Sequence, residues 1–332
     1  MQINNQKSKV KSQKSKLKIY QIKPHLHYPD IQGAVITIGG FDGVHRGHQK
    51  IFKQGIALAN KIKKPFGVIT FSPIPAIEIY KYFHFALTTD KEKIEVLQNL
   101  KVDFLGMIKF TSHIKNIEAG QFISDYIVKT IKPSIIVVGE DFHFGKEHKG
   151  NIALLKKLGQ EFGFDVKVVL SYKSHNALVK STRIRELIIL GNVRRANELL
   201  DRPHSITGKI IKGKGLATQL GFPTLNIKIP EKEKLVPADG VYQIKAKFSG
   251  KTYDGVMNIG FTPTIPDKLR AYSMRSLEIH LLDYVGTSET SLGKELRVEF
   301  YNYLRPEKKF DSLEELKHQI AEDIKKVKGM VK

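Results

Sequence analysis

A junction near the start of the chain, residues 35–52, constrains the fold more than any other stretch. The β-branched run Val35–Ile38 has strand character, Gly39 and Gly40 interrupt it, and the residues from Gln49 onward have the pattern of a helix. A strand, a glycine turn and a helix in this order present free backbone N–H groups and the positive end of a helix to a phosphate. The junction therefore predicts a phosphate-binding loop.

Two histidines three positions apart, His45 and His48, lie at the start of this predicted helix. Their imidazole N–H groups could hold phosphoryl oxygens. Zinc ligation and a pair of solvated turn histidines are the two alternative interpretations. The chain has no cysteine, and Asp42 is the one acidic residue near the histidines, which disfavours zinc. Phosphate chemistry is the favoured interpretation.

The composition bounds the class of protein. A length of 332 residues suggests two domains, each with its own core. With 41% hydrophobic residues and no apolar run long enough to span a membrane, the chain is typical of a soluble globular protein. The absence of cysteine excludes disulfides and thiolate chemistry and fits a cytoplasmic, reducing location. The formal net charge of +22 favours polyanionic ligands such as nucleotides.

The first sixteen residues form a basic tail. This segment is rich in lysine, has no arginine and lacks the apolar core of a secretory signal. We expect it to be disordered and solvated, and contact with an acidic partner is left open.

The first half of the chain, residues 17–200, alternates strands with helices. Strands are predicted at residues 17–20, 35–38, 66–71, 104–108, 134–139 and 166–170, and helices at 50–62, 90–100, 118–131, 151–162 and 182–200. Strands that are apolar on both faces favour a Rossmann-like α/β domain, in which helices cover both faces of a parallel sheet. Loops that bind phosphate would then gather at the carboxyl ends of the strands.

The second half, residues 201–332, has a different pattern. Short strands are predicted at residues 205–212, 224–229, 240–248, 252–260, 276–283 and 295–303. A closing helix is predicted to run from just after Ser312 to Val327, with a capping box from Ser312 to Glu315. Closely spaced strands with one closing helix favour a small antiparallel β-barrel.

Three motifs in the first half resemble a known family. Residues 39–48 resemble the nucleotidyltransferase superfamily, which has a glycine-phenylalanine-aspartate loop followed by H-x-G-H. Residues 141–145 match a G-x-D-F-x-F-G loop, and residues 181–185 match an S-T-x-I-R helix start. Together they resemble the bacterial family of bifunctional riboflavin kinase/FMN adenylyltransferases, the prokaryotic FAD synthetases. One departure is Ile74, which stands where the family often has a histidine, so no role for that histidine is carried over.

The resemblance implies a set of residues for adenylyl transfer. His45, His48 and Arg183 would be catalytic, and Arg185 would supply a further phosphate donor because guanidinium groups bind phosphate at two points. An incoming phosphate would attack the α-phosphorus of ATP and release pyrophosphate without a covalent intermediate, with Mg²⁺ bridging the phosphates. The implied nucleotide-binding residues are Gly39, Gly40, Phe41, Asp42, His45, His48, Asp141, Ser181, Thr182, Arg183 and Arg185.

A motif in the second half, residues 220–226, resembles the G-F-P-T-x-N pattern of the flavokinase barrel. Taken by itself it would be a turn before a strand. The resemblance implies that Thr224 and Asn226 contact the nucleotide phosphates and Mg²⁺, since hydroxyl and amide oxygens suit a hard cation. Gly213 is an implied nucleotide-binding residue upstream of the motif. Further matches follow in family order at residues 237–242, 258–260, 263–264, 277–283, 304–305 and 309–310.

The kinase reaction needs a carboxylate that accepts the proton of the substrate hydroxyl. Glu278 matches the catalytic glutamate of the family, although by itself it would be an outward-facing strand residue. A second departure lies upstream, where Ala217 and Thr218 replace a glycine-arginine pair, and Lys212 and Lys214 are candidates to compensate for the lost donor.

We therefore expect an enzyme that makes FMN from riboflavin and ATP, and then FAD from FMN and ATP, with Mg²⁺ as cofactor. The alternatives are an adenylyltransferase with an impaired kinase barrel, or a basic nucleic-acid-binding protein on a nucleotidyltransferase fold. Nucleic acid is disfavoured because the basic residues are not interleaved with aromatic ones. Riboflavin, FMN and ATP are the expected partners; no membrane partner is expected, and a weak homo-oligomer is left open.

Overall fold

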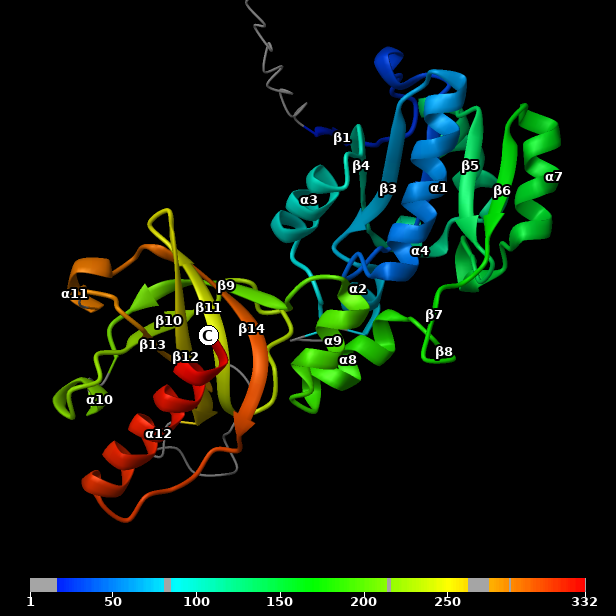
Figure 1. Ribbon diagram of the computed structural model, residues 1–332. Coiled ribbons are helices and arrows are strands. Elements are labelled where there is room, and N and C mark those ends of the chain that lie inside the picture. The colour runs from blue at the N-terminus through cyan, green and yellow to red at the C-terminus, as the bar shows by residue number, and fades with distance from the viewer. Residues whose placement is uncertain (1–16, 81–84, 214–215, 262–274, 287, 332) are drawn as a thin grey trace, which may run out of the picture.

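The computed structural model describes residues 17–80, 85–213, 216–261, 275–286 and 288–331 (Figure 1). Several positions singled out above lie outside the described residues, namely the tail at 1–16, Lys214, Pro263 and Thr264.

Six parallel strands form one sheet in the order β1-β4-β3-β2-β5-β6 (Figure 1). They are β1 (Lys18–Gln21), β2 (Val35–Ile38), β3 (Phe66–Ser72), β4 (Phe104–Lys109), β5 (Ile135–Gly139) and β6 (Asp165–Val169). Every residue of β2 is buried, as expected of a central strand with helices on both faces. The predicted α/β fold of the first half is confirmed.

Helices cover both faces of this sheet, so its strands divide their side chains between two buried clusters. Ile36 and Ile136 contribute to one cluster, and Val35 and Val137 to the other. The helices are η1 (Pro29–Ile31), α1 (Arg46–Ile62), α2 (Pro75–Tyr80), α3 (Asp90–Asn99), α4 (Ser112–Asn116), α5 (Ala119–Phe122), η2 (Ile123–Val128), α6 (Lys129–Ile131), η3 (Lys146–His148) and α7 (Ile152–Phe162). The single helix predicted over 118–131 consists of α5, η2 and α6, with the middle part in π-helical geometry.

The prediction of one helix over residues 182–200 is wrong. The chain forms two helices there, α8 (Ser181–Ile189) and α9 (Val193–Leu200). Gly191 has a left-handed φ of +77°, which ends α8, and the Asn192 side chain accepts the backbone N–H of Arg195 and so begins α9. Both helices lie between the sheet and the second half of the chain (Figure 1).

The second half is a closed antiparallel barrel in the order β10-β13-β12-β11-β14-β9, as predicted. Its strands are β9 (Ser205–Ile211), β10 (Leu225–Lys228), β11 (Gly240–Phe248), β12 (Lys251–Phe261), β13 (Arg275–Leu281) and β14 (Glu295–Arg305). The remaining elements are the hairpin β7 (Lys173–Ser174) and β8 (Ala177–Leu178), which was not predicted, and the helices α10 (Leu216–Gln219), α11 (Ser288–Ser291) and α12 (Leu313–Val331).

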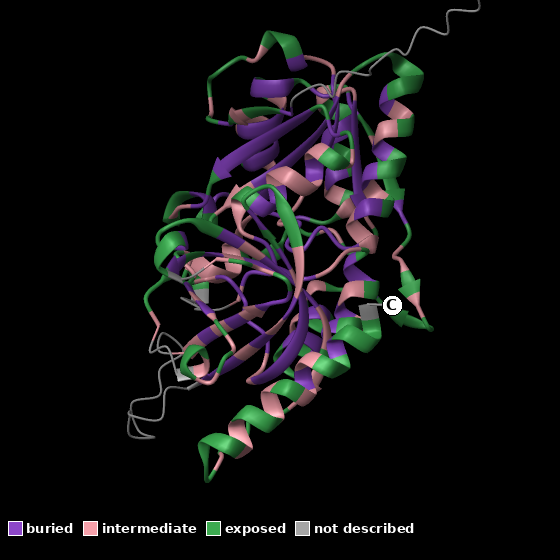
Figure 2. Cartoon of the chain, turned by 60° about the vertical axis from the view of Figure 1, so that its left-hand side comes forward, coloured by how far each residue is buried: buried purple, intermediate pink, exposed green. Residues whose placement is uncertain are grey.

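The closing helix α12 is longer than predicted, because it continues to Val331. The Ser312 hydroxyl accepts the backbone N–H of Glu315 at 3.1 Å, which is half of the predicted capping box. The Glu315 carboxylate accepts the N–H of Asp311 in place of the N–H of Ser312. Figure 2 shows the buried residues concentrated on the strands, whereas α12 is largely exposed or half-buried. None of the helices in the described part of the chain has the length and apolar character needed to cross a membrane.

Candidate active sites

Three loops meet at the carboxyl edge of the sheet and enclose a cavity of about 230 Å³. They follow the neighbouring strands β2, β5 and β6, and the strand order reverses at β2, where an open α/β sheet commonly binds its ligand. The cavity is lined by His45, Gly47, His48, Ile51, Gly139, Asp141, Val169, Leu170, Ser171, Tyr172, Leu178, Val179, Lys180 and Ser181.

His45 caps the helix that leads away from this cavity. Its Nδ1 accepts the backbone N–H of His48 at 3.4 Å, so α1 begins at Arg46, four residues before the predicted helix. The imidazole rings of His45 and His48 stack, with their centroids 3.6 Å apart. Gly47 makes room for this pair, because a Cβ there would lie 3.1 Å from ring atoms of His45.

Burial keeps both imidazoles neutral in the absence of a ligand. It lowers the pKa of His45 to about 4; Asp42 opposes the shift, while Arg202 and Arg185 add to it. The pKa of His48 is also well below its usual value, first through burial and then through His45. Because Nδ1 of His45 is an acceptor, its proton is on Nε2, which leaves a neutral N–H donor on a residue that lines the cavity. The Nδ1 atom of His48 is buried without a hydrogen-bond partner in the described structure.

Asp42 lies behind the cavity and holds its first loop in place. Its buried carboxylate accepts the backbone N–H groups of Leu87 at 3.0 Å and Thr88 at 3.1 Å, and it pairs with Nη2 of Arg185 at 2.6 Å. The Ser181 hydroxyl donates to the backbone carbonyl of Asp42 at 2.9 Å. In this structure Asp42 and Arg185 therefore order the loop rather than face the cavity.

Gly39, Gly40 and Phe41 also shape the loop from behind. The Phe41 ring packs edge-on against His48, with the ring centroids 5.2 Å apart. A Cβ on Gly39 would lie 2.9 Å from the Phe41 ring, so a larger residue would push that ring away. The Lys93 ammonium donates to the Gly40 carbonyl at 3.1 Å.

The helix-start motif at residues 181–185 is divided between the cavity and the surface. Ser181 lines the cavity, whereas Thr182 and Arg183 are exposed, and Arg183 pairs with Glu186 at 3.0 Å. At the position of the first departure, Ile74 is buried and brings no polar group.

Sequence reasoning missed Ser171, Tyr172 and Lys180, which line the cavity beside the predicted Asp141. Lys180 pairs with Asp141 at 3.3 Å. Ser171 and Tyr172 follow β6 just as the predicted loops follow β2 and β5, so the rule of strand ends could have found them.

A second polar site lies on the outer face of the barrel. Glu278 on β13 is the register partner of Asn226 on β10 and of Asn258 on β12, so the three side chains form a row on one face. Their neighbours along the strands, such as Leu277 and Ile279, belong to the barrel core. The Ser276 hydroxyl donates to the Glu278 carboxylate at 3.1 Å and limits its rotation.

The predicted motif loop lies against this row. Asn226 touches Gly213 so closely that a Cβ there would lie 2.0 Å from its amide nitrogen, which explains the need for glycine. The Pro223 carbonyl accepts a hydrogen bond from Nδ1 of His280 at 2.9 Å, which ties the loop to β13. Thr224, half-buried, directly precedes β10.

The second departure lies in the short helix α10. The carbonyl of Ala217 accepts the N–H of Phe222 at 2.9 Å, and the carbonyl of Thr218 accepts the N–H of Gly221 at 3.1 Å. Both residues thus use backbone groups to form the turn that carries the motif. Lys212 is exposed nearby.

Comparisons with known proteins relate the chain to two family models. Residues 28–183 match the family model described as FAD synthetase, and residues 200–331 match the model described as riboflavin kinase. A bifunctional riboflavin kinase/FMN adenylyltransferase of Escherichia coli (strain K12) is 35% identical, over 88% of this chain and 91% of the relative. A protein of the same description from Haemophilus influenzae is 34% identical, over 90% and 94%. A crystal structure described as a macrolide-efflux protein from Streptococcus pneumoniae aligns with a TM-score of 0.83 at 26% identity, over 94% of this chain and 99% of that chain.

Proposed function

The chain belongs to the family of bifunctional riboflavin kinase/FMN adenylyltransferases, and we propose which of its two sites catalyses which reaction. The enzyme phosphorylates riboflavin to FMN with ATP and then transfers AMP from a second ATP to FMN, giving FAD and pyrophosphate. We assign adenylyl transfer to residues 17–200 and riboflavin phosphorylation to residues 201–332. The observation that carries the assignment is that residues of three motifs line one cavity at the sheet edge, while Asn226 and Glu278 are neighbours on the barrel face.

In adenylyl transfer, a phosphate oxygen of FMN forms a bond to the α-phosphorus of ATP as the bond to pyrophosphate breaks. The Nε2–H of His45 and the amino end of α1 would donate to the phosphoryl oxygens as negative charge builds on them. His48 would act beside it, and Lys180 and Ser181 would hold the phosphates from the other wall. Arg183 would reach a phosphate only by exchanging its pair with Glu186.

In riboflavin phosphorylation, Glu278 would accept the proton of the terminal ribityl hydroxyl as that oxygen attacks the γ-phosphorus of ATP. Ser276 orients the carboxylate. Thr224 and Asn226 would hold the nucleotide, and Gly213 would let the loop approach it closely.

The residues at the barrel site fit a magnesium ion. The Asn226 amide, the Glu278 carboxylate and the Thr224 hydroxyl supply the hard oxygen donors that Mg²⁺ prefers, and Asn226 and Glu278 are direct neighbours across two strands. Bound there with ATP, the ion would neutralise phosphate charge. We propose that Thr224 and Asn226 are its protein ligands.

We also propose that the kinase half is active despite Ala217 and Thr218. Their backbone groups make the turn contacts that carry the motif, so these contacts do not depend on glycine and arginine side chains. The proposed location is the cytoplasm, since both reactions consume ATP and the chain has no cysteine.

A chromatographic product assay with ATP and Mg²⁺ tests this function, run once with riboflavin and once with FMN. We expect FMN and FAD from riboflavin, and FAD from FMN. If FMN gives FAD but riboflavin stays unchanged, the enzyme is an adenylyltransferase with an impaired barrel. If neither tube contains product, the assignment of both activities is wrong.

Two variants serve as controls for each other in this assay. Glu278→Gln should lower FMN formation by about 100-fold, since a lost general base typically costs that much, while FAD formation from FMN persists. His48→Ala should lower FAD formation from FMN, while FMN formation from riboflavin persists. A His48→Ala enzyme with full FAD synthesis would exclude the phosphate role of His48, and a Glu278→Gln enzyme with normal FMN formation would exclude the base.

A further inference from the structure

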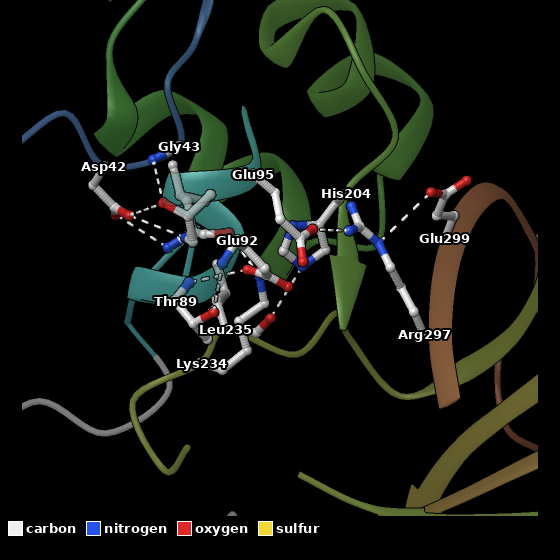
Figure 3. Close-up of polar contacts among 12 residues, drawn as sticks. Asp42, Gly43, Thr89, Glu92, Glu95, His204, Lys234, Leu235, Arg297 and Glu299 are labelled. Atoms are coloured by element: carbon white, nitrogen blue, oxygen red, sulfur yellow. Dashed lines mark hydrogen bonds and ion pairs between the residues drawn. The ribbon is translucent and has the colours of Figure 1, made fainter. Parts of the chain in front are cut away.

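Residues 85–89 connect the adenylyl-transfer site to the barrel half of the chain. On one side, the N–H groups of Leu87 and Thr88 donate to the labelled Asp42 (Figure 3). The carbonyl of Phe85 accepts a hydrogen bond from Nε of Arg185 at 2.9 Å. The Thr88 hydroxyl in turn accepts the N–H of Gly43 at 3.1 Å. The segment therefore touches the loop two residues before His45.

On its other side, the same segment pairs with residues 233–235, which belong to the barrel half. The N–H groups of Phe85 and Ala86 both donate to the Glu233 carbonyl at 2.7 Å, and the N–H of Leu235 donates to the Ala86 carbonyl at 2.9 Å. Residues 85–89 thus lie between the loop of one site and the other half of the chain.

Lys234 adds a side-chain bond to this pairing. Its ammonium donates to the Leu87 carbonyl at 2.7 Å and to Oε2 of Glu92 at 2.5 Å (Figure 3). Only 1% of the Lys234 side chain and 7% of the Glu92 side chain are exposed. The same Glu92 oxygen accepts the N–H of Thr89 at 3.0 Å and so fixes the start of α3.

One residue, Leu87, thus joins the two halves. The carbonyl of Leu87 accepts a hydrogen bond from Lys234, and its N–H donates to Asp42. A shift of Leu87 therefore moves its carbonyl and its N–H together. Gly43 packs so tightly on Leu87 that a Cβ at Gly43 would lie 2.8 Å from the leucine side chain. A displaced Leu87 would therefore displace the loop that carries His45.

We propose that Lys234, from the barrel half, is a positioning residue for adenylyl transfer. It would hold Leu87, and through Asp42 the histidine loop, in the geometry that the reaction needs. This inference rests on the proposed assignment of adenylyl transfer to the sheet cavity. It adds to that assignment a requirement on the other half of the chain.

The test compares both activities in the same full-length enzyme. Lys234→Met should lower kcat for FAD formation from FMN by about tenfold, the effect expected from losing one charged hydrogen bond. Riboflavin phosphorylation should stay within about twofold of the unmodified enzyme, because the Lys234 ammonium bonds Leu87 and Glu92, which lie outside the barrel. The kinase activity of each sample also reports how much of the enzyme is folded.

Arg297→Met is the matched control. Arg297 also lies on the barrel half, and its ion pairs are with Glu95 at 2.5 Å across the interface and with Glu299 at 3.7 Å on the barrel (Figure 3). Its replacement removes the same charge from the same interface. We expect both activities of Arg297→Met to stay close to those of the unmodified enzyme. An equal loss of FAD formation in the two variants would overturn the proposal, because general loosening of the interface would explain both.

The double variant Lys234→Met/Glu92→Gln separates positioning from stability. Lys234→Met alone leaves a buried carboxylate unpaired and could unfold the chain, whereas the double variant has neither charge. We expect its melting temperature to recover while FAD formation stays low. Recovery of FAD formation together with stability would overturn the inference alone. An unmodified enzyme that makes no FAD from FMN would overturn the proposed function and this inference with it.

Discussion

Residues of one motif do different work in the folded chain. His45 and His48 line the cavity, while Asp42 turns its carboxylate away to Leu87, Thr88 and Arg185. The Asp42 carboxylate is thus held by one guanidinium and two backbone N–H groups. The motif therefore contains both groups that line the cavity and groups that hold those in place.

Buried neutral histidines make stability depend on pH. His204 is fully enclosed, and its Nε2 donates to the Leu235 carbonyl at 3.0 Å. Burial, followed by the charge of Lys234, lowers the pKa of His204 well below its usual value. Its ordinary pKa is about 6.5, so the unfolded chain takes up a proton that the folded chain does not as the pH falls below that value. The folded state is thus favoured above this pH and loses stability below it.

We predict that the difference in the free energy of unfolding between the unmodified protein and His204→Gln becomes smaller as the pH falls from 7 to 5. We call this difference the stability gap. Only the unmodified protein has a buried neutral histidine at this position. Its free energy of unfolding therefore falls by up to about 1.4 kcal/mol for each pH unit below about 6.5. Urea unfolding at several pH values measures the gap. His113→Gln, at an exposed position on α4, is the control for the histidine-to-glutamine change itself. A constant gap for His204→Gln would contradict the prediction.

At the scale of elements, caps decide where helices begin and end. The histidine at the cap moves the start of α1 forward to Arg46, next to the loop that is predicted to bind phosphate. Apolar periodicity alone located this helix but not its first turn, because the residues of that turn face a cavity rather than the core. In the same way, the apolar pattern across residues 182–200 predicted one helix. The left-handed Gly191 separates this stretch into α8 and α9.

We predict that Gly191→Ala destabilises the protein more than Gly163→Ala does. Both glycines follow helices with left-handed φ values, +77° and +79°, so each alanine should cost about 1–2 kcal/mol of unfolding free energy. A Cβ on Gly163 meets nothing within 4 Å, whereas one on Gly191 lies 3.2 Å from the Tyr303 ring. Crowding against the barrel should add roughly 1 kcal/mol. Equal losses in urea unfolding would show that Tyr303 moves aside freely.

At the scale of the whole molecule, the two halves meet through polar groups as well as apolar ones. Leu87 and Leu235 join α8 and α9 in one buried cluster between sheet and barrel. The Lys234–Glu92 pair and the Arg297–Glu95 pair cross the same interface. A buried ion pair costs desolvation and is weak evidence for stability, but its directionality restricts the relative placement of the halves.

The net charge of +22 leads to a prediction about nucleic acid. Five lysines lie in residues 1–16, and we expect deletion of this tail to abolish most salt-sensitive retention on DNA without changing FAD synthesis. A full-length variant with these lysines changed to glutamine controls for chain length. Chromatography over a range of salt concentrations measures retention. Undiminished retention after deletion would contradict this and favour the nucleic-acid alternative.

The sequence alone was sufficient for the fold class and for the place of the first loop. Strand and helix periods are local, and buried parallel strands require apolar residues on both faces, so the α/β half and the barrel could both be predicted. The glycines and histidines of residues 39–48 likewise indicated phosphate chemistry at a strand end. These features depend on neighbours along the chain.

Only the tertiary structure decided which polar groups meet. Asp42 binds the backbone of Leu87, 45 residues away, and Lys234 binds Glu92, 142 residues away. Tyr172 and Lys180 reach the cavity because β6 lies beside β5 and the following hairpin returns to it. No local pattern encodes such contacts, since they depend on how the sheet and barrel bring distant segments together and on burial that removes water from between them.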